Sequence, residues 1–251
     1  LIDCDYVLVD NRPILRLFGK TKNNDSVCAF YNGFSPYFYV LPKKNLEKKL
    51  IEFLQDHFKH LLSDIEELQT FLPIGFQKEK NNLFKIVLKD PSQVAAIRDE
   101  LKKQDFVSEI FEADILFKYR FMADFNLCGM KSIKIVGDNA NTFTIKTDKA
   151  IHIKHIESVE EDTNANLKFI GVDIEVVPGG EGVPDPLRDP IVIFSLSFFP
   201  AFEAHNTLVL ISKSIKKKEK DVLVFRTEKE MLEEFAVSYT HLRAHETGRN
   251  L

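Results

Sequence analysis

Residues 167–175 read Leu167-Lys-Phe-Ile-Gly-Val-Asp-Ile-Glu175, an apolar run that ends in two acidic residues. The run predicts a strand that is buried until it reaches the acids. Side chains two positions apart in a strand project from the same face, so the carboxylates of Asp173 and Glu175 should lie side by side. Such a pair packs poorly in a core but binds hard divalent cations such as Mg²⁺ or Mn²⁺ well. The alternative interpretation is a pair of solvated acids at a strand end that binds no metal.

The residues after this strand predict an α/β domain. A loop rich in proline and glycine spans 178–190, and a second apolar strand follows at 191–197. Further strands are predicted at 207–211 and 222–225, and a helix at 228–235. Three or four strands followed by a helix indicate the first part of a domain in which helices pack against a sheet.

The N-terminal part predicts a hairpin and then a ferredoxin-like unit. The hairpin strands are expected at 6–9 and 14–18, flanking the turn-forming Asp10-Asn-Arg-Pro13. The elements predicted after them are strands at 27–31 and 37–41, a helix at 45–57, strands at 65–71 and 83–88, a helix that begins at Pro91, and a strand at 106–111. From 37 onward the order is β-α-β-β-α-β, although residues 64–68 also fit a helix. Many nucleic-acid-binding modules use this fold, but so do unrelated proteins.

The middle of the chain predicts the boundaries of the domains. A helix at 116–126 leads to a predicted hairpin of strands at 133–136 and 142–146, turning at 137–139. The expected organisation is an α+β N-terminal domain at 1–150, an acidic linker at 151–166, an α/β domain at 167–236 and a tail at 237–251. The fold class predicted for the whole chain is therefore α/β.

The tail has the pattern of a cloning artefact. Residues 237–247 back-translate without a mismatch into the end sequence of a transposase-based sequencing-library adapter. We therefore expect 237–251 to be non-native and the natural reading frame to continue past codon 236. The alternative is a genuine C-terminal helix with His241 and His245 at metal-ligand spacing.

Composition excludes few classes of protein. The 251 residues carry 34 Lys and Arg against 38 Asp and Glu, whereas proteins that bind nucleic acid are usually basic. No apolar run is long enough to cross a bilayer and no signal-peptide pattern opens the chain, so a cytoplasmic protein is expected. The three scattered cysteines predict free thiols. The pairs His57/His60 and His152/His155 have no cysteine or acidic cluster beside them, so they are predicted to be surface histidines. The lysine-rich segment 213–220 is predicted to be a solvated turn.

Several segments resemble archaeal-type family B DNA polymerases. The segments Phe169-Ile-Gly-Val-Asp-Ile-Glu-Val176 and Asp189-Pro-Ile-Val-Ile-Phe-Ser-Leu196 are similar to the first exonuclease motif of that family and the strand after it. Segments similar to the opening of the family are Asp5-Tyr6, Arg12-Pro-Ile-Leu-Arg-Leu-Phe18, Phe34-Ser-Pro-Tyr-Phe-Tyr39, Asp90-Pro-Ser-Gln-Val-Ala-Ala-Ile-Arg98 and Ile110-Phe-Glu-Ala-Asp-Ile-Leu-Phe-Lys-Tyr-Arg120. These segments occur in the same order as in the family. The resemblance identifies the chain as the N-terminal domain followed by a truncated RNase H-like 3′→5′ exonuclease domain.

This resemblance implies that Asp173 and Glu175 are catalytic residues and ligands of Mg²⁺ or Mn²⁺ in a two-metal site. The family uses two further aspartates from later motifs, and its polymerase motifs also lie later, so the fragment is expected to be inactive in both reactions. The implied partners are DNA template-primer and single-stranded DNA, with dNTPs and a sliding clamp for the full-length parent and no membrane.

The resemblance also implies a pocket that captures uracil in template DNA. The residues at the matching positions are Tyr6, Pro36, Tyr37, Pro91, Val94, Ile115 and Arg120. An extruded base needs an apolar slot and a cation near the phosphate. The alternative is that the aromatic residues at 34–39 belong to the core and that Arg120 is a solvated helix charge. Leu116 stands where the archaeal sequences often have proline.

Two other functions stay open at this point. One is a stand-alone module that binds single-stranded nucleic acid through the ferredoxin-like unit, and the other is a small RNase H-like nuclease. A viral rather than archaeal family B enzyme also fits the sequence.

Overall fold

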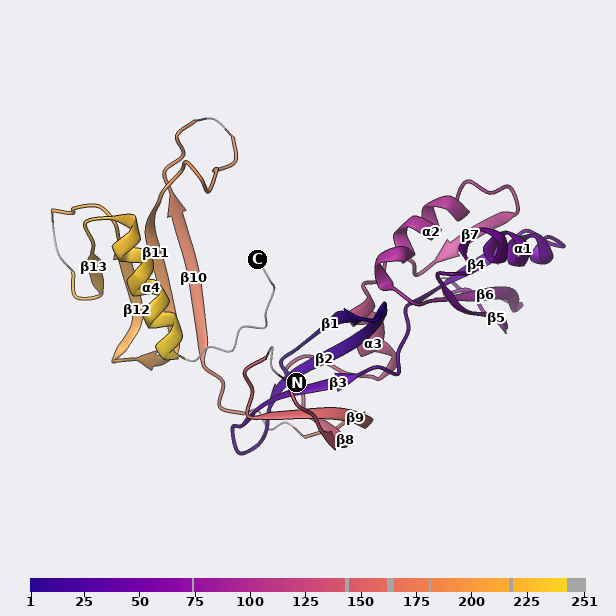
Figure 1. Cartoon of the computed structure of the whole chain (residues 1–251), viewed down its shortest axis with the longest axis horizontal. Coiled ribbons are helices and arrows are strands. Elements are labelled where there is room, and N and C mark those ends of the chain that lie inside the picture. Colours follow the sequence, from indigo (N-terminus) through magenta and orange to yellow (C-terminus); the bar gives the residue numbers. More distant parts are fainter. Residues whose placement is uncertain (74, 143–144, 162–164, 181, 217–218, 243–251) are drawn as a thin grey trace. The chain divides into compact units, whose positions relative to one another are not determined.

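The computed structural model describes residues 1–73, 75–142, 145–161, 165–180, 182–216 and 219–242 (Figure 1). The chain forms two compact units, Leu1–Ala165 and Asn166–Leu251. Each unit has its own sheets and its own buried core, so each is described by itself.

One sheet of the first unit has five strands in the order β1-β2-β3-β9-β8. Their bounds are β1 Asp3–Val9, β2 Arg12–Lys20, β3 Ser26–Tyr31, β8 Ile133–Asn139 and β9 Lys149–Ser158. All neighbours are antiparallel except β3 and β9. Helix α3, Phe117–Asp124, supplies Phe117 and Phe121 to a core with Leu15 and Leu17 of β2. The alternating apolar side chains of β2 therefore pack against α3.

The predicted N-terminal hairpin is confirmed. Asp10 and Asn11 join β1 to β2 with φ of 49° and 58°. Two consecutive residues with positive φ form the turn type whose twist matches that of the flanking strands, and Asp and Asn tolerate this region better than most residues.

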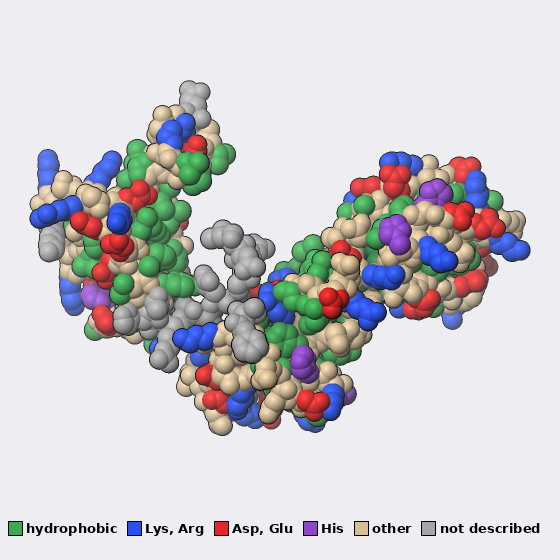
Figure 2. Space-filling view, viewed as in Figure 1, with side chains coloured by type: hydrophobic (Ala, Val, Ile, Leu, Met, Phe, Trp, Pro, Cys, Tyr) green, Lys and Arg blue, Asp and Glu red, His purple; other side chains and the backbone are tan. Residues whose placement is uncertain are grey.

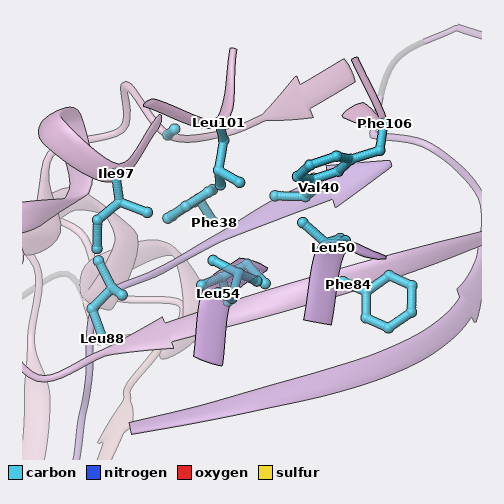
Figure 3. Packing of buried hydrophobic residues seen from close by; sticks show 11 residues of the cluster. Phe38, Val40, Leu50, Leu54, Phe84, Leu88, Ile97, Leu101 and Phe106 are labelled. Atoms are coloured by element: carbon cyan, nitrogen blue, oxygen red, sulfur yellow. The ribbon is translucent and has the colours of Figure 1, made fainter. Parts of the chain in front are cut away.

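The predicted ferredoxin-like unit is also confirmed. Its elements are β4 Tyr37–Pro42, α1 Glu47–Phe58, β5 Leu62–Thr70, β6 Asn81–Leu88, the 3₁₀ turn η1 Pro91–Gln93, α2 Val94–Leu101 and β7 Val107–Phe111. The strand order is β5-β6-β4-β7, with every pair antiparallel. Figure 3 shows Phe38 and Val40 of β4 packed against Leu50 and Leu54 of α1. Residues 64–68 are strand, because pairing with β6 overrides their local helical pattern.

Two predictions for the middle of the chain are wrong. Strand β8 extends through residues 137–139, which were expected to turn, and it pairs with β9. Strand β9 occupies 149–158, which includes residues 151–158, half of the predicted linker at 151–166. Its exposed lysine, histidine and glutamate residues make the segment look polar, although Ile153 and Ile156 are buried. The strand expected at 142–146 includes residues 143–144, which lie outside the described residues.

The second unit is a four-stranded sheet with one helix. Its elements are β10 Phe169–Val176, β11 Ile191–Phe202, β12 His205–Ile211, β13 Val222–Val224 and α4 Glu228–Leu242. The strands run in sequence order and are antiparallel except for β12 and β13. Helix α4 covers β11 and β12, with Phe235 stacked on Phe194 at 4.5 Å between ring centroids. The strands and the helix predicted for 167–235 are therefore confirmed. The predicted burial of β10 is wrong, because this strand lies at the edge of the sheet and most of its residues are exposed.

Helix α4 runs without a break across residue 237, where the predicted tail begins. In this part of the helix, Ser238 is buried. Residues 243–251 lie outside the described residues, so the adapter origin of 237–251 stays a prediction from the codons alone.

Candidate active site

Asp173 and Glu175 lie on one face of β10, as their spacing predicts. Asp173 is opposite Ser195 of β11, and Glu175 is opposite Ile193. An open pocket of about 550 Å³ lies beside Asp173. Its lining residues are Gly171, Val172, Asp173, Ser195, Leu196, Ser197, Thr207 and Val209. Most of the side chains on this face are small, so space is left next to the Asp173 carboxylate.

Gly171 contributes directly to this space. It lies opposite Ser197 in the β10–β11 pair, and a Cβ at position 171 would come within 2.5 Å of Ser197 Oγ. The close approach requires glycine unless the serine side chain rotates away. The sequence Gly171-Val-Asp173 thus places the first acid beside a residue that has no side chain.

Strand β10 is also exposed on its other face. Val172 and Ile174 are 45% and 46% exposed, because α4 packs over β11 and β12 rather than over this edge strand. Figure 2 shows hydrophobic side chains gathered along the strands of this unit. Asp173 and Glu175 therefore lie on an edge strand, and the described residues of this unit leave both of its faces exposed.

The two carboxylates fit half of a divalent-cation site. Neither the Asp173 nor the Glu175 carboxylate makes a hydrogen bond or an ion pair with another described residue. Their Cα atoms are roughly 7 Å apart by the rise of a strand, a span that two carboxylates can bridge around one cation. No cluster of three or more metal-ligating side chains occurs in the described ranges. Mg²⁺ prefers six oxygen ligands, so these residues supply only part of a coordination shell.

The loop after Glu175 is organised by Asp189, a residue that the sequence analysis did not single out. The Asp189 side chain is fully buried and accepts hydrogen bonds from the Gly179 and Asp185 amides, both at 2.8 Å. Arg188 also binds it, through Nε at 2.8 Å and Nη2 at 3.1 Å. Arg188 and the two backbone amides hold the pKa of Asp189 well below its usual range. The only sequence signal was the Asp-Pro step immediately before a strand.

Aromatic contacts link three of the residues predicted to bind template uracil. Tyr6 meets Phe117 edge-on at 5.2 Å, and Phe117 stacks on Phe34 at 5.5 Å. Phe34 in turn contacts Tyr37, and the Arg120 guanidinium lies 4.8 Å from the centre of the Tyr37 ring. Burial and the charge of nearby Asp90 raise the pKa of Tyr6. Pro91 is the first residue of η1, as predicted from its position in the sequence.

The other predicted pocket residues have mixed surroundings. Pro36 is buried, and its carbonyl accepts a hydrogen bond from the Leu88 amide at 2.8 Å. Val94 packs against the core of the ferredoxin-like unit, which favours a packing role for it. Ile115 and the neighbouring Leu116 are 42% and 63% exposed.

Arg120 is buried, so the alternative of a solvated helix charge is wrong. Only 9% of the residue is exposed, and its Nη2 lies 2.5 Å from Glu112 Oε2. The geometry is that of an ion pair rather than a well-aligned hydrogen bond, and Arg120 Nε has no hydrogen-bond partner among the described residues. A buried guanidinium is costly unless its N–H groups are bonded. Arg120 therefore retains unused donors next to Tyr37.

The histidine and cysteine predictions are consistent with the structure. His57 stacks on Phe53 at 4.3 Å, and His152 contacts the ring of Phe30. Cys4 and Cys28 are buried free thiols, and burial raises their pKa values to about 12 and about 11. The lysine-rich segment 213–220 includes residues 217–218, which lie outside the described residues.

Comparison with known proteins identifies the family. The family model described as "DNA polymerase family B, exonuclease domain" matches residues 108–245, which is more than half of the chain. The chain therefore belongs to the family B DNA polymerases, and the match includes both Asp173 and Glu175. The match does not favour a stand-alone binding module.

Individual relatives agree with this assignment. DNA polymerase 2 of Aeropyrum pernix is 28% identical over 202 residues, covering 78% of this chain and 25% of the relative. The DNA polymerase delta catalytic subunit of Arabidopsis thaliana is 26% identical over 256 residues, covering 88% and 23%. The family B DNA polymerase of Pyrobaculum calidifontis shares the fold, with a TM-score of 0.69 and 20% identity, covering 97% of this chain and 29% of that one. The chain thus spans about a quarter of the length of its curated relatives.

Within the described ranges, every helix is too short or too polar to cross a bilayer.

Proposed function

We propose that the chain is the N-terminal domain and the first part of the proofreading exonuclease of a DNA-directed DNA polymerase. The observation that carries this proposal is the placement of Asp173 and Glu175. Both belong to the matched exonuclease region, project from one face of β10, and have no partner among the described residues. Paired, uncompensated carboxylates on an open face of small side chains suit a cation and a substrate better than they suit packing.

Asp173 and Glu175 would hold Mg²⁺ or Mn²⁺ through their carboxylate oxygens. When bound, such an ion activates a water and stabilises the leaving oxygen of a phosphodiester. The residues of the chain itself contribute three things. The two carboxylates hold the cation, Gly171 and Ser195 keep the space beside Asp173 free for a single-stranded 3′ end, and β11 fixes the direction of β10.

The activity of the whole polymerase requires groups beyond this pair. Two further acidic ligands and the dNTP-binding residues are proposed to belong to the remaining three quarters of the relatives' length, as is any contact with a sliding clamp. We therefore expect the purified chain to show no Mg²⁺-dependent DNA hydrolysis. Hydrolysis that Asp173→Ala abolishes would contradict this. A cytoplasmic location is proposed from the three free cysteines.

A titration with Mn²⁺ tests the metal pair directly. Mn²⁺ broadens the NMR signals of nearby groups even when it binds weakly, so the signals of residues 171–175 should broaden first. Asp173→Asn and Glu175→Gln should each remove this effect. Glu203→Gln removes an exposed carboxylate from the turn before β12 and serves as the matched control. Equal broadening in all four proteins would show that the ion does not use this pair.

A second function, capture of uracil in single-stranded template, is favoured by Arg120. Its buried Nε lacks a partner, and its guanidinium lies over Tyr37. A deoxynucleotide extruded toward Tyr6 and Tyr37 would find apolar rings and an available donor together. The test is a fluorescence anisotropy titration with matched single strands that contain either uracil or thymine. Tighter binding of the uracil strand, lost in Arg120→Met, supports the pocket, and equal affinity for both strands would exclude it.

A further inference from the structure

The loop between β10 and β11 is closed by one side chain. Both carboxylate oxygens of Asp189 are used: Oδ1 accepts from the Gly179 amide and Arg188 Nε, and Oδ2 accepts from the Asp185 amide and Arg188 Nη2. We call these four residues, Gly179, Asp185, Arg188 and Asp189, the carboxylate clasp. Leaving a buried carboxylate unpaired is strongly destabilising, so the clasp should stay closed in the folded protein.

No apolar side chain of the loop takes over this role. Val183 and Leu187, the large apolar residues in its centre, are 91% and 97% exposed. Loops without buried apolar contacts are normally the first parts of a protein to open. Since the described loop residues gain so little from hydrophobic burial, the carboxylate clasp is what fixes their conformation.

The clasp is joined directly to the strand that carries the acids. Glu175 pairs with Ile193, but Val176 pairs with Ile191, so the register shifts immediately after Glu175. The Val177 amide then donates to the Pro190 carbonyl at 3.2 Å, and Pro190 follows Asp189. A bulge of this kind changes the direction in which neighbouring side chains point. Only Pro190, Val177 and Val176 thus separate Asp189 from Glu175 along this path.

The start of β11 is fixed independently of the loop. The Ile191 amide donates to Glu228 Oε1 at 2.8 Å, at the beginning of α4. The loop therefore has one anchored end at Ile191, and the clasp connects that end to Gly179, which follows Glu175 by four residues.

We propose that Asp189 is a positioning residue for the acidic pair: by closing the clasp, it sets the direction of the Glu175 carboxylate relative to Asp173. The inference rests on the proposed metal-binding function of that pair. Asp189 does not touch the cation and acts only through the loop and the bulge. Arg188 assists it and is more exposed, with 56% of its side chain accessible.

Asp189→Asn in the full 251-residue chain tests this role. The variant keeps the size of the side chain but replaces one acceptor oxygen by an NH₂ group, so at least one amide loses its bond. Asp185→Asn is the matched control, because it removes a carboxylate from the same loop while the Asp185 amide can still donate to Asp189. Three quantities are measured by NMR: amide exchange at Gly179 and Asp185, the chemical shifts of Glu175, and broadening by Mn²⁺.

In Asp189→Asn, we expect amide exchange at Gly179 and Asp185 to speed up about tenfold, as for the loss of one hydrogen bond to a charged group. The Glu175 signals should shift, and the apparent Mn²⁺ affinity should fall roughly tenfold, the lower end for residues that orient metal ligands. The control should change the affinity less than twofold. Faster exchange with unchanged Glu175 shifts and unchanged affinity would overturn the proposal, because Asp189 would then hold only the loop.

Two further outcomes remain decisive. If the wild-type chain binds no Mn²⁺, the proposed metal function fails, but the Glu175 shifts still decide whether Asp189 positions that residue. If Asp189→Asn does not fold, Arg188→Met removes two of the four bonds while the carboxylate and both amide bonds remain. A smaller shift of the Glu175 signals in Arg188→Met supports the proposal, and no shift contradicts it.

Discussion

Ser195 of β11 lies directly opposite Asp173 of β10 in the antiparallel pair. Directly opposed side chains have Cβ atoms about 5 Å apart, so the small serine leaves the Asp173 carboxylate accessible from the side of β11. The pocket beside Asp173 depends on this pairing as much as on the acid itself.

The first prediction follows from that space. Ser195→Leu should place an apolar side chain beside the Asp173 carboxylate and reduce the broadening of its signals by Mn²⁺ at least severalfold, while the protein stays folded. Asn206→Leu adds the same bulk at an exposed position of β12 and should have no such effect. Unchanged broadening in Ser195→Leu would show that the cation approaches the acids from another direction.

The second prediction concerns Tyr37 and pH. Burial raises the pKa of Tyr37, and so does its hydrogen bond to Asp124 Oδ2 at 2.6 Å. The unfolded chain releases the tyrosine proton near pH 10, whereas the folded protein keeps it. The contribution of Tyr37 to stability is therefore complete below about pH 10 and is lost as the pH rises above that value.

Urea unfolding at several pH values checks this dependence. The free energy of unfolding of the wild-type protein should fall more steeply above pH 10 than that of Tyr37→Phe. At pH 7 the variant should be less stable by about 1 kcal/mol, the typical net value of one hydrogen bond. Parallel pH profiles for the two proteins would rule out a raised pKa for Tyr37.

The third prediction concerns the ion pair between Glu112 and Arg120. Their side chains are 25% and 11% exposed, so Glu112→Gln leaves a largely buried guanidinium without a counter-charge. Breaking a buried pair costs about 3 kcal/mol at the lower end of measured values, and the partial exposure places this pair there. Chemical denaturation measures the loss.

A second substitution separates charge from packing at this site. Adding Arg120→Met to Glu112→Gln should restore most of the stability, because neither buried charge remains. Glu109→Gln, an exposed change on β7 three residues before Glu112, should alter the stability by less than about 0.5 kcal/mol. If the double variant is as unstable as Glu112→Gln, then the buried charge of Arg120 is not the cause.

The fourth prediction concerns the turn between β1 and β2. Asn11 has a φ of 58°, a region that glycine adopts without steric cost. Asn11→Gly should therefore keep or raise the stability, by up to about 1 kcal/mol, whereas Asn11→Val should lower it. Thermal unfolding of both variants tests the order, and a more stable Asn11→Val would show that the turn differs from the one described.

Local pattern was sufficient for most of the fold. The alternation in β2 and β4 and the helical spacing in α1 predicted these elements, because each has one apolar face that must be buried. Strand β9 was missed because its exposed side chains are charged and one of its two pairing partners, β3, is far away in sequence. Pairing with a distant strand leaves no local pattern in the sequence that would distinguish β9 from a polar linker.

In the candidate site, the shared face of Asp173 and Glu175 follows from the residue order alone, because side chains in a strand alternate with a period of two residues. The surroundings of the two carboxylates depend on how the chain folds. Ser195 and Asp189 reach their positions through the register of β11 and through the closure of a loop, and both depend on contacts between residues that are separated along the chain. The burial of Arg120 also depends on the tertiary structure, since a charged side chain on a helix becomes buried only when other elements pack around it.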